Sequence, residues 1–143
     1  MTADYWIEVD GDREEAFEVR FAVFVEEQGV DPDIEVDDHE DEATHFVAYH
    51  DGDPVGAARL REPEDGVGKV ERLAVRQSHR GEGLGRRLMD AVETEARRRE
   101  LTRLTLHGQV RVADFYANLG YEQVSDEFKE AGIPHVEMTK SIS

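Results

Sequence analysis

The sequence contains no cysteine. This absence excludes disulfides, thiolate metal sites and a cysteine nucleophile. A Gly-x-Ser-x-Gly segment, which would present a serine nucleophile at a sharp turn, is also lacking. Covalent catalysis through either residue type is therefore excluded, and a reaction of this chain would proceed by direct attack of one substrate on another.

Long hydrophobic runs are missing as well. No stretch approaches the ~18 uninterrupted apolar residues of a membrane span. Residues 1–6 (MTADYW) show neither the basic segment nor the apolar core of a secretory signal. We therefore expect a cytoplasmic protein without a membrane partner. Its 143 residues include only four prolines and no repeat or Gly/Ser linker, which predicts a single domain over residues 1–143.

Positive charge is scarce. The chain has 17 Lys and Arg against 34 Asp and Glu, a net charge of −17. Such a surface repels nucleic acid, so we expect no nucleic-acid partner. The excess of acidic residues could bind a basic partner. Alternatively, it could be an adaptation to high salt, where carboxylates keep the protein hydrated and salt screens their mutual repulsion. Because the carboxylates are spread along the chain, we favour a halophile-like protein.

Apolar periodicity and turn residues predict the order β-α-β-β-β-α-β-α-β-β, a mixed sheet of the α/β class with helices on its faces. Asp12 is the predicted N-cap of the first helix, with Glu15 completing a capping box. Residues 31–42 are predicted to be a dense acidic loop. The predicted strands cover residues 5–9, 44–50, 55–60, 67–75, 103–107, 121–124 and 135–139, and the predicted helices cover 13–23, 83–99 and 112–119.

A strand at residues 70–75 leads into a glycine-rich turn at 80–85 (RGEGLG) that opens an amphipathic helix. Free backbone N–H groups and the helix dipole converge at such a turn, which suits a pyrophosphate. A P-loop would need Gly-Lys-Ser/Thr where residues 85–87 are Gly-Arg-Arg. A dinucleotide-binding turn would need glycine at Leu88. Both of these alternatives fit poorly.

Two segments carry a resemblance to a known family. Residues 80–85 match the Arg/Gln-x-x-Gly-x-Gly/Ala signature of the GCN5-related N-acetyltransferase (GNAT) superfamily, and residues 115–121 (FYANLGY) match its second hallmark. The resemblance extends over about residues 20–138. It implies the GNAT fold and an enzyme that moves an acetyl group from acetyl-CoA to a primary amine. Features similar to the ElaA-like branch are Arg20, residues 23–28 (VFVEEQ), His45, Gln109 and residues 132–135 (GIPH).

The resemblance also implies where acetyl-CoA lies. Its pyrophosphate would rest on the amides of residues 81–86, and its pantetheine arm would run beside residues 73–75, between two splayed strands. A backbone N–H there would polarise the thioester carbonyl. Many members carry Asn at the position of Val110, and Gln109 is expected to substitute. The expected cofactor-binding residues are Leu73, Ala74, Val75, Arg80, Gly81, Glu82, Gly83, Leu84, Gly85, Arg86, Gln109 and Phe115.

Tyr116 is the predicted general acid. Its phenol, with an ordinary pKa of ~10, would protonate the departing CoA thiolate, whose pKa is ~8.5. Glu71 is the first candidate for the general base and Glu27 the second. His107 and His135 could act through a water molecule. No metal is expected to take part.

Several alternatives stay open at this point. The chain could be a non-catalytic acyl-CoA-binding or sensor module, or a plain structural domain. Residues 31–42 echo a calcium loop, but Val36 occupies the position that needs glycine, and Pro32 intrudes. An acidic cleft would suit a cationic small amine or a basic protein terminus. Because superfamily members are often dimers, a homodimer is the expected assembly.

Overall fold

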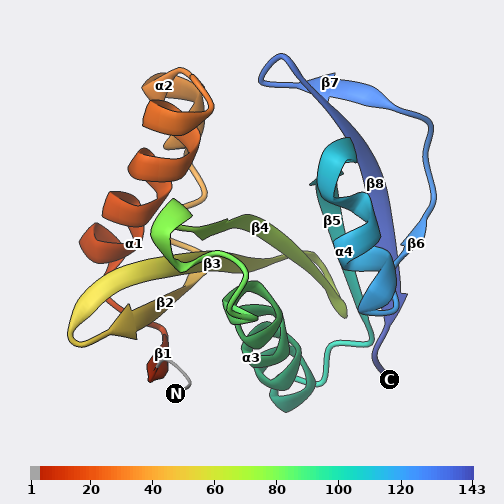
Figure 1. Cartoon of the computed structure of the whole chain (residues 1–143). Coiled ribbons are helices and arrows are strands. Elements are labelled where there is room, and N and C mark those ends of the chain that lie inside the picture. Colours follow the sequence, from red (N-terminus) through yellow and green to blue (C-terminus); the bar gives the residue numbers. More distant parts are fainter. Residues whose placement is uncertain (1–3) are drawn as a thin grey trace.

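The computed structural model describes residues 4–143 and contains a mixed sheet with the strand order β1-β2-β3-β4-β5-β8-β6, with β7 beside β8 (Figure 1). Only β4 and β5 pair in parallel among these strands. The strands are β1 (Tyr5–Val9), β2 (Thr44–His50), β3 (Asp53–Glu64), β4 (Val67–Val75), β5 (Arg103–Gln109), β6 (Glu122–Gln123), β7 (Phe128–Glu130) and β8 (Ile133–Ser141).

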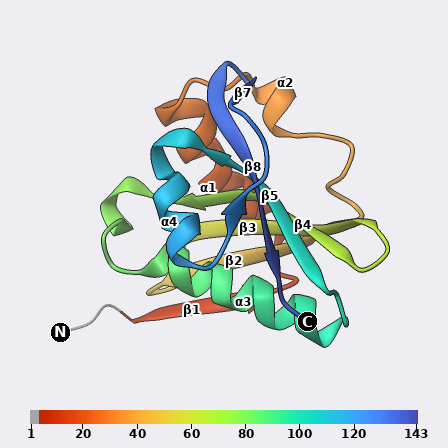
Figure 2. The same ribbon diagram turned by 90° about the vertical axis from the view of Figure 1, so that its right-hand side faces the viewer.

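Helices cover both faces of the sheet. Helix α1 and the segments that follow it lie on one face, and α3 lies on the other (Figures 1 and 2). Helix α4 packs against β5. The helical elements are α1 (Arg13–Arg20), the π-helical segment η1 (Phe21–Glu27), α2 (Pro32–Glu35), the 3₁₀ turn η2 (Gln77–His79), α3 (Leu84–Arg98), the 3₁₀ turn η3 (Val110–Val112) and α4 (Ala113–Asn118).

Two apolar clusters hold these layers together. The larger lies between the sheet and α3, where Leu88 and Val92 are fully buried. The smaller lies under α1, where Ala16 and Val19 contact the other face of the sheet. Burying a Val or Leu side chain stabilises the fold by ~1.5–3 kcal/mol. The alternation of apolar residues along each strand therefore supplies both clusters from one sheet.

The mixed α/β fold class and the order of the predicted elements are confirmed, with two additions. Asp12 caps α1 by accepting hydrogen bonds from the N–H groups of Glu14 and Glu15. The Glu15 carboxylate, however, accepts from the Tyr49 hydroxyl at 2.9 Å instead of completing a capping box. The short elements α2 and β7 were not predicted, because each has only three or four residues and no readable period.

The sheet divides between β4 and β5. Their parallel pairing runs only from Val67 beside Arg103 to Val70 beside Leu106. Beyond this point the two strands diverge, as Figure 1 shows. A β-bulge in β4 lies at the start of the divergent part, where Arg72 has a φ of 58°. A non-glycine residue rarely adopts this conformation, and such strain is typical of functional sites.

Within residues 4–143, no helix combines the length and the apolar character that a membrane crossing requires.

Candidate functional site

A cavity of about 860 Å³ opens where β4 and β5 diverge. This volume is in the usual range for ligand pockets. Two predicted site residues, Glu27 and Glu82, do not line it. The cavity brings together the other predicted site residues, namely Glu71, Leu73, Ala74, Val75, Arg80, Gly81, Gly83, Leu84, Gly85, Arg86, Gln109, Phe115 and Tyr116.

The glycine-rich turn forms one end of the cavity. Gly81 and Gly83 have φ angles of 81° and 78°, which strain any residue with a Cβ atom. Gly85 is favoured for a different reason, because a Cβ atom there would lie 3.3 Å from Cζ of Phe115, which is a tight contact. In the described part of the chain, the backbone N–H groups of residues 81–86 have no protein acceptor. Together with the α3 dipole they form an anion site.

Glu27 lies outside the cavity and holds Arg80 in place. Its two carboxylate oxygens accept hydrogen bonds from both Nη atoms of Arg80 at 2.7 Å. Arg80 also donates from Nε to the carbonyl of Val75 at 2.9 Å. Glu27 thus connects η1 to the glycine-rich turn. This placement argues against the predicted role of Glu27 as general base.

Gln109 lines the cavity at the end of β5, whereas the neighbouring Val110 is exposed and does not. The Gln109 side chain donates from Nε2 to Oε1 of Gln28 at 2.9 Å. It also accepts from Nε of Arg111 at 2.9 Å. The amide is therefore fixed across the cavity, between η1 and β5.

Tyr116 projects from α4 into the opening. Its ring packs against Gly108, where a Cβ atom would lie 3.0 Å from Cδ2 of Tyr116. Its hydroxyl has no hydrogen-bond partner among residues 4–143, and the side chain lines the cavity. Burial raises the pKa of Tyr116 to about 12. The phenol therefore stays protonated throughout the neutral range and can donate a hydrogen bond.

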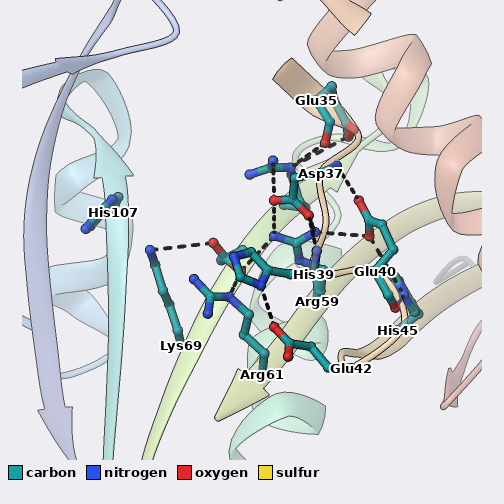
Figure 3. Close-up of polar contacts among 12 residues, drawn as sticks. Glu35, Asp37, His39, Glu40, Glu42, His45, Arg59, Arg61, Lys69 and His107 are labelled. Carbon is teal, nitrogen blue, oxygen red and sulfur yellow. Dashed lines mark hydrogen bonds and ion pairs between the residues drawn. The ribbon is translucent and has the colours of Figure 1, made fainter. Parts of the chain in front are cut away.

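The predicted acidic loop is in fact anchored by a buried ion-pair network (Figure 3). Glu35 and Glu40, from this segment, are 2% and 6% exposed. Both bind Arg20, with Nε to Oε1 of Glu35 at 2.5 Å and Nη2 to Oε2 of Glu40 at 2.8 Å. Composition indicated a dense acidic loop, and the sequence does not show that Arg20 points toward it. The segment instead forms a wall of the cavity.

Arg59 is the centre of this network. It is fully buried and donates to Asp37 at 2.8 and 2.9 Å and to Glu71 at 2.8 Å. Nη1 of Arg59 also lies 3.0 Å from Oε1 of Glu40. Burial raises the pKa of Glu40, but the hydrogen bonds and charges of Arg20 and Arg59 outweigh it and lower that pKa to about 2. Glu40 is therefore a carboxylate throughout the neutral range.

Glu71 lines the cavity but is bound by three cations. Oε1 accepts from Arg59 at 2.8 Å and from Arg61 at 2.7 Å, and Oε2 lies 3.6 Å from Nζ of Lys69. Burial raises the pKa of Glu71, but these cations lower it by more. A carboxylate with a lowered pKa is a weak proton acceptor. Glu71 therefore fits the predicted role of general base poorly.

A histidine and a carboxylate form a pair on the other side of the cavity. Nδ1 of His107, on β5, lies 2.9 Å from Oε1 of Glu130, on β7. The hydrogen bond from His107 is the largest cause of the lowered pKa of Glu130. Because a carboxylate accepts, Nδ1 donates, and Nε2 is the ring nitrogen left for another partner. Nε2 has no hydrogen-bond partner within the described chain, and His107 lines the cavity.

His135 supports this pair. Its Nδ1 donates to the carbonyl of Ile133 at 2.7 Å, and its Nε2 lies 3.7 Å from Oε2 of Glu130. The ring of Phe128 packs edge-on against His107 and face-on against His135. Sequence analysis missed Glu130 because the short strand β7 that positions it carries no periodic signal. A carboxylate within five residues of the GIPH segment was the available hint.

Residues 31–42, which resemble a calcium loop in sequence, have other partners in the structure. Asp31 caps α2 by accepting a hydrogen bond from the N–H of Asp33 at 2.9 Å. Glu35 binds Arg20. Across residues 4–143, no group of three or more His, Asp or Glu side chains is arranged to hold a metal ion.

Comparisons with known proteins agree with this geometry. The family described as "Acetyltransferase (GNAT) domain" matches residues 10–142. The uncharacterized N-acetyltransferase YjcF of Bacillus subtilis is 43% identical over 127 residues, which cover 88% of this chain and 90% of YjcF. Protein ElaA of Escherichia coli is 30% identical over 129 residues, 87% of this chain and 84% of ElaA. The crystal structure of an acyl-CoA N-acyltransferase from Pseudomonas aeruginosa superposes with a TM-score of 0.81 at 27% identity, covering 97% of this chain and 99% of that one.

The chain belongs to the GNAT family of acetyltransferases. It is an acyl-CoA-dependent N-acyltransferase, and the predicted GNAT membership and fold are confirmed.

Proposed function

We propose that this protein transfers an acetyl group from acetyl-CoA to a primary amine by direct attack in a ternary complex. The observation that carries the proposal is the cavity between β4 and β5, with unpaired amides of residues 81–86 at one end and the Tyr116 hydroxyl inside. A GNAT acetyltransferase of Elizabethkingia anophelis that shares the fold has acetyl-CoA bound. The chain has no cysteine, so no acyl-cysteine can form.

In this proposal the pyrophosphate occupies the glycine-rich turn and the pantetheine arm lies along residues 73–75. The free edge of β4 beyond Val70 offers it backbone hydrogen bonds. The amine attacks the thioester carbon, the tetrahedral intermediate expels the CoA thiolate, and Tyr116 donates a hydrogen bond to the sulfur. A backbone N–H at the β4 bulge stabilises the oxyanion.

The test is turnover of acetyl-CoA with a panel of primary amines. CoA release is followed with a thiol reagent, and the acetylated amine is identified by mass spectrometry. The protein itself contributes no thiol to this signal, because it has no cysteine. We expect amine-dependent CoA release with the matching acetylated product. Binding of acetyl-CoA by calorimetry without turnover of any amine would favour the non-catalytic binding module instead.

We further propose that His107 is the general base, in place of Glu71 and Glu27. His107 lines the cavity, and Glu130 engages its Nδ1, so that Nε2 is the nitrogen available to an acceptor amine. Histidine is the side chain that most often serves as a general base in enzymes.

The His107→Gln variant is expected to lower kcat/KM by about 100-fold at neutral pH. The deficit should shrink as the pH rises toward the pKa of the acceptor amine, because the solvent then supplies the deprotonated nucleophile. Rates are measured from pH 6.5 to 9.5 for both proteins. His50→Gln is the matched control, since His50 does not line the cavity. A deficit that does not change with pH would assign His107 a structural role.

A further inference from the structure

One side chain of the cavity wall has unused hydrogen-bonding groups. Arg61, on β3, donates from Nε to Oε1 of Glu71 at 2.7 Å, and its side chain is 14% exposed. Its two Nη nitrogens have no partner within the described part of the chain. In Figure 3 the guanidinium extends toward the side of the sheet where His107 lies. A guanidinium fork in this state fits a carboxylate or phosphate group.

The two other arginines of the ion-pair network that lie next to Arg61 are already in use. Arg72 donates to the carbonyls of Glu35 and Ile34 and to Asp37. Arg59 is fully buried and bound to Asp37 and Glu71. Arg61 is therefore the arginine of this network with a free end in the cavity.

The carboxylates of the wall are equally occupied, so the wall is not the acidic surface that the composition suggested. Glu35 and Asp37 line the cavity, yet each is bound by two arginines. Glu71 is bound by Arg59, Arg61 and Lys69. A carboxylate paired in this way has little capacity left for a cationic amine, whereas the Arg61 fork is open to an anion.

The sheet register sets the size of the ligand. Arg61 lies beside Lys69, and Lys69 beside Thr105. Adjacent strands are ~4.8 Å apart, so the Cα atoms of Arg61 and Thr105 are separated by about 10 Å. His107 is two residues further along β5, on the same face. The long Arg61 side chain spans part of the distance between β3 and β5. A small molecule is therefore sufficient to reach from its guanidinium to His107.

We infer that the acceptor is a small primary amine that carries a carboxylate or phosphate a few bonds from its nitrogen, and that Arg61 binds this anionic group. The inference rests on the proposed acetyl transfer and specifies its substrate class. Arg61 orients the acceptor so that its amine meets His107 Nε2 and the thioester. A fixed positive charge near the amine also favours its neutral, nucleophilic form.

The test compares matched pairs of acceptors, glycine with glycinamide and phosphoethanolamine with ethanolamine. The wild type is expected to favour the anionic member of at least one pair by ~10-fold or more in kcat/KM, as for a charge-assisted bidentate contact. The pair that shows the larger preference tells whether the group is a carboxylate or a phosphate. Arg61→Gln should reduce the preference to less than about threefold, mainly through KM.

Lys69→Gln is the matched control. Lys69 also contacts Glu71 but does not line the cavity, so the preference should persist in this variant. Equal rates for the anionic and neutral members, or a preference that survives Arg61→Gln, would overturn the inference. If no amine is acetylated, calorimetry of glycine and phosphoethanolamine with the CoA complex decides. Arg61-dependent binding would uphold the anion site while the transfer proposal fails, and no binding would refute the site.

Discussion

Replacing Tyr116 with phenylalanine is expected to lower kcat by about 100-fold or more. The variant removes one hydroxyl that faces the cavity and has no protein partner in residues 4–143. The departing thiolate then loses the donor that stabilises it. Acetyl-CoA affinity should stay within about threefold, because the pyrophosphate turn and the β4 edge are unchanged. Steady-state thiol release and calorimetry with acetyl-CoA measure the two quantities separately.

Tyr121→Phe is the matched control for this experiment. Its ring lies 6.1 Å from that of Tyr116, but its buried hydroxyl has no hydrogen-bond partner among residues 4–143, and Tyr121 does not line the cavity. Removing that hydroxyl should leave turnover unchanged and should not lower the free energy of unfolding. A Tyr116→Phe variant as active as the wild type would exclude the phenol from catalysis. Comparable losses in both variants would indicate a packing effect.

Replacing Glu40 with alanine is expected to lower the free energy of unfolding by about 3–5 kcal/mol. In the wild type, Glu40 contacts both Arg20 and Arg59, each of which is at most 1% exposed. The substitution removes this shared counterion from two buried positive charges. This loss is a large part of the 5–15 kcal/mol that usually stabilises a domain. Urea unfolding followed by circular dichroism measures it.

Glu42→Ala is the control from the same segment. The Glu42 side chain is 58% exposed, and its one polar partner within the described residues is the partly exposed His39, so its removal should change the stability by less than about 1 kcal/mol. A small loss for Glu40→Ala, similar to that of Glu42→Ala, would contradict a structural role for the network.

The ion-pair network also predicts that the folded protein loses stability in acid. The pKa of Glu40 falls from 4.5 to about 2 on folding, because of its hydrogen bonds with arginines. A lowered carboxyl pKa stabilises the folded protein above pH ~4.5, and this contribution is lost as the pH falls toward 2. This contribution amounts to about 3 kcal/mol at neutral pH. The Glu40→Ala variant should therefore lose less stability than the wild type over this window.

The sequence was sufficient to predict the sheet, its major helices and the glycine-rich turn. Each of these rests on a local signal: the alternation in residues 44–50, the spacing of Leu84, Leu88 and Val92, or the glycines of residues 80–85. The positions of Tyr116 and of residues 73–75 followed from the resemblance to the GNAT superfamily. The structure places them along one cavity.

The partners of the candidate bases and of the acidic segment could not be predicted in the same way. Glu71 and Glu27 were chosen for their place along the chain, but the role of a carboxylate depends on its partners in space. Arg59 and Arg61 bind the first, and Arg80 binds the second. The His107–Glu130 pair joins residues 23 positions apart through the unpredicted strand β7. Pairings of this kind arise from topology, which no local pattern records.

The short parallel ladder between β4 and β5 has a mechanical consequence. The hydrogen bonds that connect the first four strands to the rest of the sheet lie between residues 67–70 and 103–106. An arm bound along residues 73–75 would extend this ladder and act as a removable strand that links the two parts. Amide hydrogen exchange beyond Val70 in β4 should therefore slow when the donor binds and quicken again when the product leaves, so that the sheet closes and opens once in every catalytic cycle.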